Sequence, residues 1–75
     1  MTRFEVAAHW DAEVGVWVAQ SSDIPGLVAE AATWDELKAK LVALAPELIE
    51  LNNVKVDKDG AEMHILTEDS ATVAA

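Results

Sequence analysis

Hydrophobic and polar side chains alternate near the start of the chain. From Phe4 to Trp10 every second residue is a core-type apolar side chain, which is the period-two pattern of a strand with one buried face. After a short polar connection at 11–13, residues 14–20 are rich in β-branched and aromatic side chains. The two segments therefore predict an antiparallel hairpin.

A strong turn signal follows the hairpin. Asp23 begins the turn, Pro25 presets φ at its first central position, and Gly26 supplies the positive φ that a type II turn needs at its second. The chain must reverse here, and the short apolar segment from Leu27 to Glu30 predicts a third strand that completes a meander.

The next segment has the start signal and the periodicity of a helix. Thr33 and Glu36 fit a capping box, so the helix should begin at Trp34. Pro46 lies within the helical pattern and predicts a kink or a break followed by one last turn, and Asn52 and Asn53 should end the helix. Leucines recur at spacings of four and three and predict one buried face: Leu37, Leu41, Leu44, Leu48 and Leu51.

The last third of the chain contains one further strand signal. Residues 54–57 are compatible with an extended segment, residues 58–60 with a turn, and Glu62 to Thr67 with a final strand. We therefore expect a single domain over residues 1–67 and a disordered tail over 68–75.

The composition favours self-association. The chain has 75 residues and is 52% hydrophobic, but 14 of its apolar residues are alanines, which leaves few large side chains to build a core. Small domains of this kind need disulfides, a metal or association, and the absence of cysteine excludes disulfides and thiolate metal sites. We expect a homo-oligomer, either a dimer or a larger even assembly.

The charge restricts the partners. Five Lys and Arg residues stand against 14 Asp and Glu residues, for a formal net charge of −9. This charge repels phosphate and disfavours direct nucleic-acid binding, whereas it accelerates encounter with a basic protein. The first residues lack the apolar region of a signal peptide, and no apolar run approaches the ~20 residues of a membrane span. We expect a cytoplasmic protein without a membrane partner.

No set of catalytic or metal-binding residues is evident. His9 and His64 would meet only if the first and last strands pair, and two imidazoles without a carboxylate are a weak metal signal. The carboxylates that a two-metal nuclease would need have structural reasons for their positions, in turns or at the helix start. We expect no enzyme activity and no cofactor, with a metal-dependent nuclease as a minor alternative. The carboxylates considered are Asp11, Glu13, Asp23, Glu30, Asp35 and Glu36.

Trp17 is the strongest candidate for an interface residue. In its strand Val16 and Val18 share one face, and Trp17 and Ala19 share the other. If the valines face the helix, Trp17 and Ala19 lie beside Ala7 on a sheet face that no second helix covers. We then expect Trp17, Ala19 and Ala7 at a homodimer contact; with the opposite parity, Trp17 belongs to the core.

The motifs together resemble a known family. The most specific part is the Asp23-Ile24-Pro25-Gly26 turn followed by the helix that Thr33 caps, within a match from Phe4 to Asn52. The chain resembles short, uncharacterised proteins of the DUF type that are related to HicB antitoxins. This resemblance implies an α+β fold of β-β-β-α-β order, a truncated RNase H-like architecture with one helix on a small, antiparallel-rich sheet.

The resemblance also implies a function. HicB antitoxins neutralise HicA, a small basic ribonuclease toxin, by covering it with this acidic module, and they commonly self-associate. They usually carry a C-terminal DNA-binding segment as well, but the residues after Asn52 contain no basic stripe and no helix-turn-helix pattern. The resemblance thus implies a non-catalytic protein-binding module with a HicA-like partner, the alternative being a stand-alone homo-oligomer without a toxin, and it transfers no individual site residue.

Overall fold

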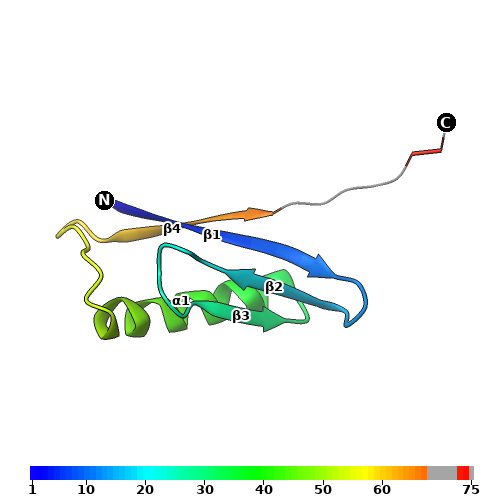
Figure 1. Ribbon diagram of the computed structural model, residues 1–75, viewed down its shortest axis with the longest axis horizontal. Coiled ribbons are helices and arrows are strands. Elements are labelled where there is room, and N and C mark those ends of the chain that lie inside the picture. The colour runs from blue at the N-terminus through cyan, green and yellow to red at the C-terminus, as the bar shows by residue number, and fades with distance from the viewer. Residues whose placement is uncertain (68–72, 75) are drawn as a thin grey trace.

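One helix packs on a four-stranded mixed sheet in the computed structural model, which describes residues 1–67 and 73–74 (Figure 1). The predicted α+β class and the β-β-β-α-β order are confirmed. Most of the predicted tail, 68–75, lies outside the described residues. The elements are β1 (Thr2–Asp11), β2 (Val16–Gln20), β3 (Val28–Ala31), α1 (Trp34–Leu51) and β4 (Ala61–Thr67).

The sheet has the order β3-β2-β1-β4. β2 pairs antiparallel with both β1 and β3, as the predicted meander requires. β4 pairs parallel with β1, from Thr2 opposite Ala61 to Ala8 opposite Thr67. The first strand therefore lies inside the sheet, and β3 and β4 form its two edges.

The core lies between the sheet and α1. In β1 the buried residues are Phe4, Val6 and Ala8, which confirms the alternation seen in the sequence. The loop between β2 and β3 adds two fully buried side chains, Ile24 and Leu27. The complete set of buried apolar residues is Phe4, Val6, Ala8, Ala19, Ile24, Leu27, Ala29, Ala31, Leu37, Leu41 and Ala45.

The predicted type II turn is confirmed. The amide of Leu27 donates to the carbonyl of Ile24 at 3.1 Å, and Gly26 has a φ of 82°. The side chain of Asn52, at the end of α1, donates to the carbonyl of Pro25 at 3.3 Å. The turn is thereby attached to the far end of the helix.

The helix begins where its capping signal predicts. The hydroxyl of Thr33 accepts from the amide of Glu36 at 3.2 Å, and Asn52 caps the other end. The predicted break at Pro46 is wrong, because α1 continues through it to Leu51. The leucine stripe is also shorter than predicted: Leu51 is 77% exposed. An 18-residue helix is about 27 Å long, and its last turn extends past the short strands β2 and β3.

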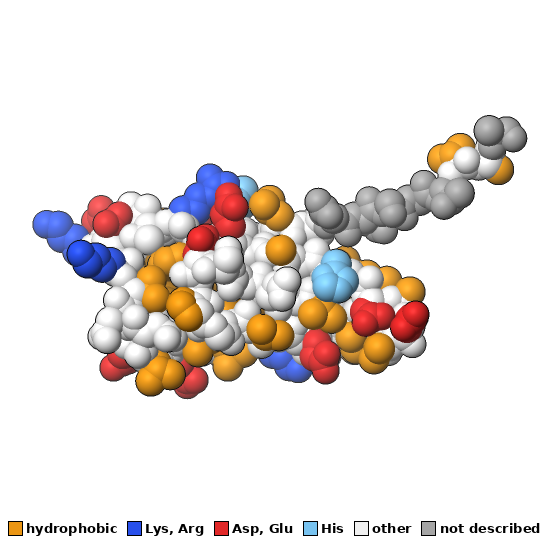
Figure 2. Space-filling view, in the orientation of Figure 1, with side chains coloured by type: hydrophobic (Ala, Val, Ile, Leu, Met, Phe, Trp, Pro, Cys, Tyr) orange, Lys and Arg blue, Asp and Glu red, His pale blue; other side chains and the backbone are white. Residues whose placement is uncertain are grey.

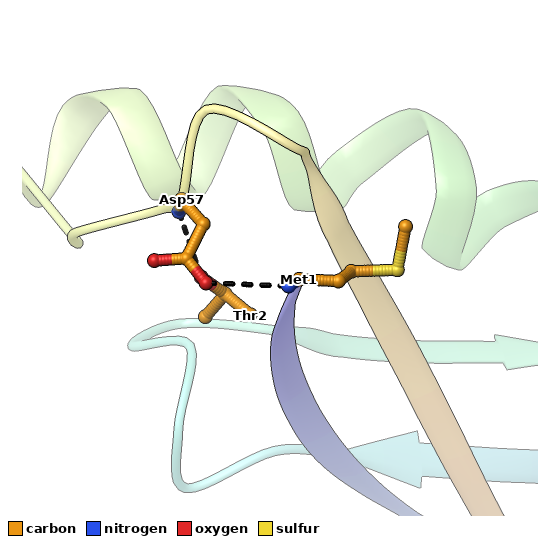
Figure 3. A network of polar contacts seen from close by, with 3 residues as sticks. All are labelled: Met1, Thr2 and Asp57. Carbon is orange, nitrogen blue, oxygen red and sulfur yellow. Dashed lines mark hydrogen bonds and ion pairs between the residues drawn. The ribbon is translucent and has the colours of Figure 1, made fainter.

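The segment between α1 and β4 is held by the first two residues of the chain, at the start of β1. Residues 54–57 form no strand, and the turn at 58–60 closes with the amide of Gly60 donating to the carbonyl of Asp57 at 2.9 Å. The amide of Asp57 donates to the hydroxyl of Thr2 at 2.7 Å, and its carboxylate lies 3.4 Å from the Met1 ammonium (Figure 3). These contacts align the start of β4 with the start of β1.

Candidate protein-interaction surface

The structure reverses the predicted faces of β2. Trp17 lies opposite Trp10 of β1 and Ala31 of β3, and Ala19 lies opposite the buried Ala8. Trp17 and Ala19 therefore face α1, and the prediction that the two valines of this strand face the helix is wrong.

This result also separates the three predicted interface residues. Ala19 is fully buried beneath the helix, and Trp17 packs against the core. Ala7 is exposed on the opposite face of the sheet, opposite Gln20. The three residues do not form one surface, because Ala19 pairs with Ala8 on the helix side and Ala7 pairs with Gln20 on the other face.

The face of the sheet away from α1 is open to solvent and mixed in character. It carries exposed apolar side chains at its two edges, Val28 on β3 and Leu66 on β4, which are 62% and 48% exposed. A shallow depression of about 450 Å³ lies between them and includes Ala7, Gln20 and Ser22 in its lining.

The two histidines lie on this open face but do not meet. His64 is opposite Glu5, where the Arg3 guanidinium contacts its ring, and His9 is opposite Val18. His9 is four residues further along β1 than Glu5, about 13 Å away. Within residues 1–67 and 73–74, no three His, Asp or Glu side chains come together as a metal site would require.

Three tryptophans form a stack that the sequence reasoning did not identify. Trp10 and Trp17 have ring centroids 5.6 Å apart at an interplanar angle of 64°, and Trp17 and Trp34 are 5.0 Å apart at 71°. Both are edge-to-face arrangements of the kind that aromatic pairs favour. Trp17 and Trp34 are partly buried, whereas Trp10, at the outer end of the stack, is 44% exposed.

Carboxylates lie close in sequence to these tryptophans, although strand alternation places Asp11 and Glu30 on the open face of the sheet and not on the helix side. Asp11 follows Trp10 in β1 and accepts from the amide of Glu13 at 3.1 Å. Lys40 of α1 donates to the carbonyl of Glu30 at 2.7 Å. We call the stack and its flanking acids the tryptophan end: Trp10, Trp17, Trp34, Asp11, Glu13, Glu30, Asp35 and Glu36.

The basic side chains are distributed unevenly along the length of the molecule, whereas acidic side chains are visible at both ends (Figure 2). The tryptophan end lies where β1 ends and α1 begins, at the right of Figure 1. Figure 2 shows red and orange side chains together at that end, whereas most of the blue side chains lie toward the opposite end. The tryptophan end therefore carries acidic side chains with few basic ones beside them.

Comparison with known proteins identifies the family. A domain family described as a domain of unknown function, DUF1902, matches residues 3–74. The chain belongs to the DUF1902 family. This DUF1902 chain is also similar to the crystal structure of a hypothetical protein from the extremely thermophilic bacterium Thermus thermophilus, at 44% identity and a TM-score of 0.84 over 95% of this chain and 99% of that one.

The comparisons test one part of the predicted resemblance, the membership of an uncharacterised family. Membership of an uncharacterised family of the DUF type is confirmed by the match. No curated protein matches this DUF1902 chain significantly. In the part of the chain that the structure describes, no helix is both long and apolar enough to cross a membrane.

Proposed function

We propose that this DUF1902 protein is a non-catalytic module that captures a small basic protein, as the toxin-neutralising domain of HicB antitoxins does. The observation that carries the proposal is the exposed Trp10 indole, held against Trp17, at the end of the molecule that has acidic side chains and few basic ones. The relation to HicB antitoxins rests on the sequence resemblance from Phe4 to Asn52.

The tryptophan end has the chemistry to hold a cationic side chain. An arginine or lysine placed over the face of an indole gains a cation–π interaction, and a nearby carboxylate can accept its hydrogen bonds. Trp10 is held against Trp17, which is held against Trp34, so little side-chain entropy is lost when a partner binds. Large aromatic side chains in this position are typical binding hot spots.

The net charge supports the same partner. At −9, the molecule attracts a basic protein over a distance comparable with the Debye length, and its acidic end orients the approach. Binding should therefore weaken as salt rises, mainly through a slower association rate.

A binding experiment with the product of a small basic reading frame beside this gene tests the proposal. We expect the two full chains to co-purify, and Trp10→Ala to weaken binding about tenfold or more. Leu51→Ala is the matched control, because Leu51 is 77% exposed at the opposite end of the molecule. Equal losses of affinity for both variants would contradict the proposal.

A second pair of variants tests the electrostatic part. Asp35→Asn and Asp59→Asn change the net charge equally, but only Asp35 belongs to the tryptophan end. We expect Asp35→Asn to slow association and to reduce its salt dependence more than Asp59→Asn does. The same effect from both variants would mean that net charge alone, and not this surface, guides the partner.

The alternative function is a stand-alone homo-oligomer without a toxin partner. It is favoured by the small core, in which the described residues supply five fully buried large side chains: Ile24, Leu27, Leu37, Leu41 and Val6. Under this alternative, no basic protein co-purifies, and association between copies is the property to be measured.

A further inference from the structure

β4 is an edge strand whose outer side is open. It pairs with β1 along one side, and no other described strand lies against its second side (Figure 1). The backbone N–H and C=O groups along this side are available to another strand. α1 lies nearest β2 and β3, so it does not cover β4.

The sequence of β4 contains few of the features that usually block an edge, its one acidic residue being Glu62. Residues 61–67 contain no Lys, Arg or Pro, and β4 pairs with β1 over its whole length without a bulge. On the helix side Met63 and Ile65 are only partly buried, beside a groove of about 420 Å³ between α1 and β4. On the open side Leu66 is 48% exposed. The edge is seven residues long and apolar on the helix side, and on the open side Leu66 stands beside the polar Glu62 and His64.

We propose that β4 pairs antiparallel with β4 of a second copy about a two-fold axis at His64. The two four-stranded sheets then become one continuous sheet, with both helices on the same side. In this register Met63 lies opposite the partner's Ile65, and Glu62 lies opposite the partner's Leu66.

The sequence of β4 selects this axis. Directly opposed residues of an antiparallel pair point to the same face, so Met63 and the partner's Ile65 meet on the helix side. An axis at His64 also pairs all seven residues of β4, from Ala61 opposite the partner's Thr67 onward. An axis at any other residue of the strand leaves some of the seven unpaired.

A second copy is the occupant that these features favour. Two copies of β4 have the same length, and Met63 of each copy lies opposite Ile65 of the other. A strand of a different sequence is therefore not required. A basic partner, by contrast, should approach the tryptophan end, where acidic side chains have few basic ones beside them. Pairing through β4 also provides the association that a 75-residue chain without cysteine is expected to need.

Charge variants at position 66 test the register in the full chain. Leu66→Glu places a carboxylate opposite Glu62 of the partner, twice per dimer because of the symmetry, and should raise the dimer Kd about tenfold. Leu66→Lys is the matched control, since it places an ammonium group opposite the same carboxylate and should keep or strengthen the dimer. Sedimentation velocity over a dilution series measures both, and thermal melts show that each monomer is folded.

A compensating substitution makes the test specific. Adding Glu62→Lys to Leu66→Glu restores opposite charges across the axis and should return the Kd to near the wild-type value. A wild-type monomer at tens of micromolar, equal effects of Glu and Lys at position 66, or no recovery in the double variant would each overturn the proposal. Trp10→Ala should leave the dimer unchanged, so this result is independent of basic-protein binding.

Discussion

The carboxylate of Asp23 accepts a hydrogen bond from the backbone amide of Glu5 at 2.8 Å, across 18 residues of sequence. The hydroxyl of Ser21 donates to the carbonyl of the same Glu5 at 2.6 Å. Pairing between β1 and β2 has ended two residues away, where Ala7 lies opposite Gln20. Two side chains of the loop therefore take the place of a strand and attach the loop to β1.

Removal of the Asp23 carboxylate should destabilise the fold. We expect Asp23→Ala to lower the free energy of unfolding by about 1 to 2 kcal/mol, because the Glu5 amide loses a charged acceptor. Ser22→Ala is the control, since Ser22 is exposed beside it and makes no side-chain hydrogen bond among the described residues. Urea denaturation of both variants measures the difference; similar midpoints would contradict the role assigned to Asp23.

Gly26 should be difficult to replace. Its φ of 82° costs a residue with a Cβ about 1 to 2 kcal/mol, and a Cβ there would lie 3.4 Å from Cδ2 of Leu48. Gly15 has a φ of 75°, and a Cβ added there would have no heavy atom within 4 Å. Gly15→Ala therefore measures the cost of the backbone conformation alone. We expect Gly26→Ala to lower the melting temperature at least as much as Gly15→Ala. A smaller effect at position 26 would show that the turn relaxes.

The helix cap can be tested by two substitutions at one position. Thr33→Ala should cost about 1 kcal/mol of stability, because the amide of Glu36 loses its acceptor, whereas Thr33→Ser keeps the hydroxyl and should stay near wild type. Thermal melts followed by circular dichroism distinguish the two. Equal melting temperatures for the Ala and Ser variants would remove the argument for this cap.

Trp17 should behave as a core residue. It contacts both other tryptophans and packs against the buried cluster, so Trp17→Ala should cost about 3 to 5 kcal/mol. Trp10→Ala should cost clearly less, because Trp10 is at the exposed end of the stack. Chemical denaturation compares the two. A folded Trp17→Ala protein of nearly normal stability would contradict this prediction and indicate that Trp17 is an interface residue.

Much of the fold was predictable because its signals are local. The alternation in β1, the Pro25-Gly26 turn and the Thr33 cap each depend on a few neighbouring residues, and all three are confirmed. The face of β2 was not predictable in this way. Both of its faces are apolar, so only its register with β1, which places Ala19 opposite Ala8, decides which one the helix covers.

The candidate surface could have been found in part. Trp10 has the same parity as Phe4, Val6 and Ala8, which places it on the helix side of β1. Its contact with Trp17 depends on the hairpin register, and the contact between Trp17 and Trp34 depends on where the helix begins relative to β2. Such contacts come from tertiary structure and have no signature in local sequence.

The parallel pairing of β1 with β4 has a consequence for the order of folding. β1, β2, β3 and α1 follow one another along the chain and can form through short connections, whereas Thr2 meets Ala61 only after a loop of most of the chain closes. We expect β4 to join last, after the hairpin and the helix have formed. Until then one side of β1 is unpaired. During synthesis the growing chain must keep this side of β1 from pairing with other strands.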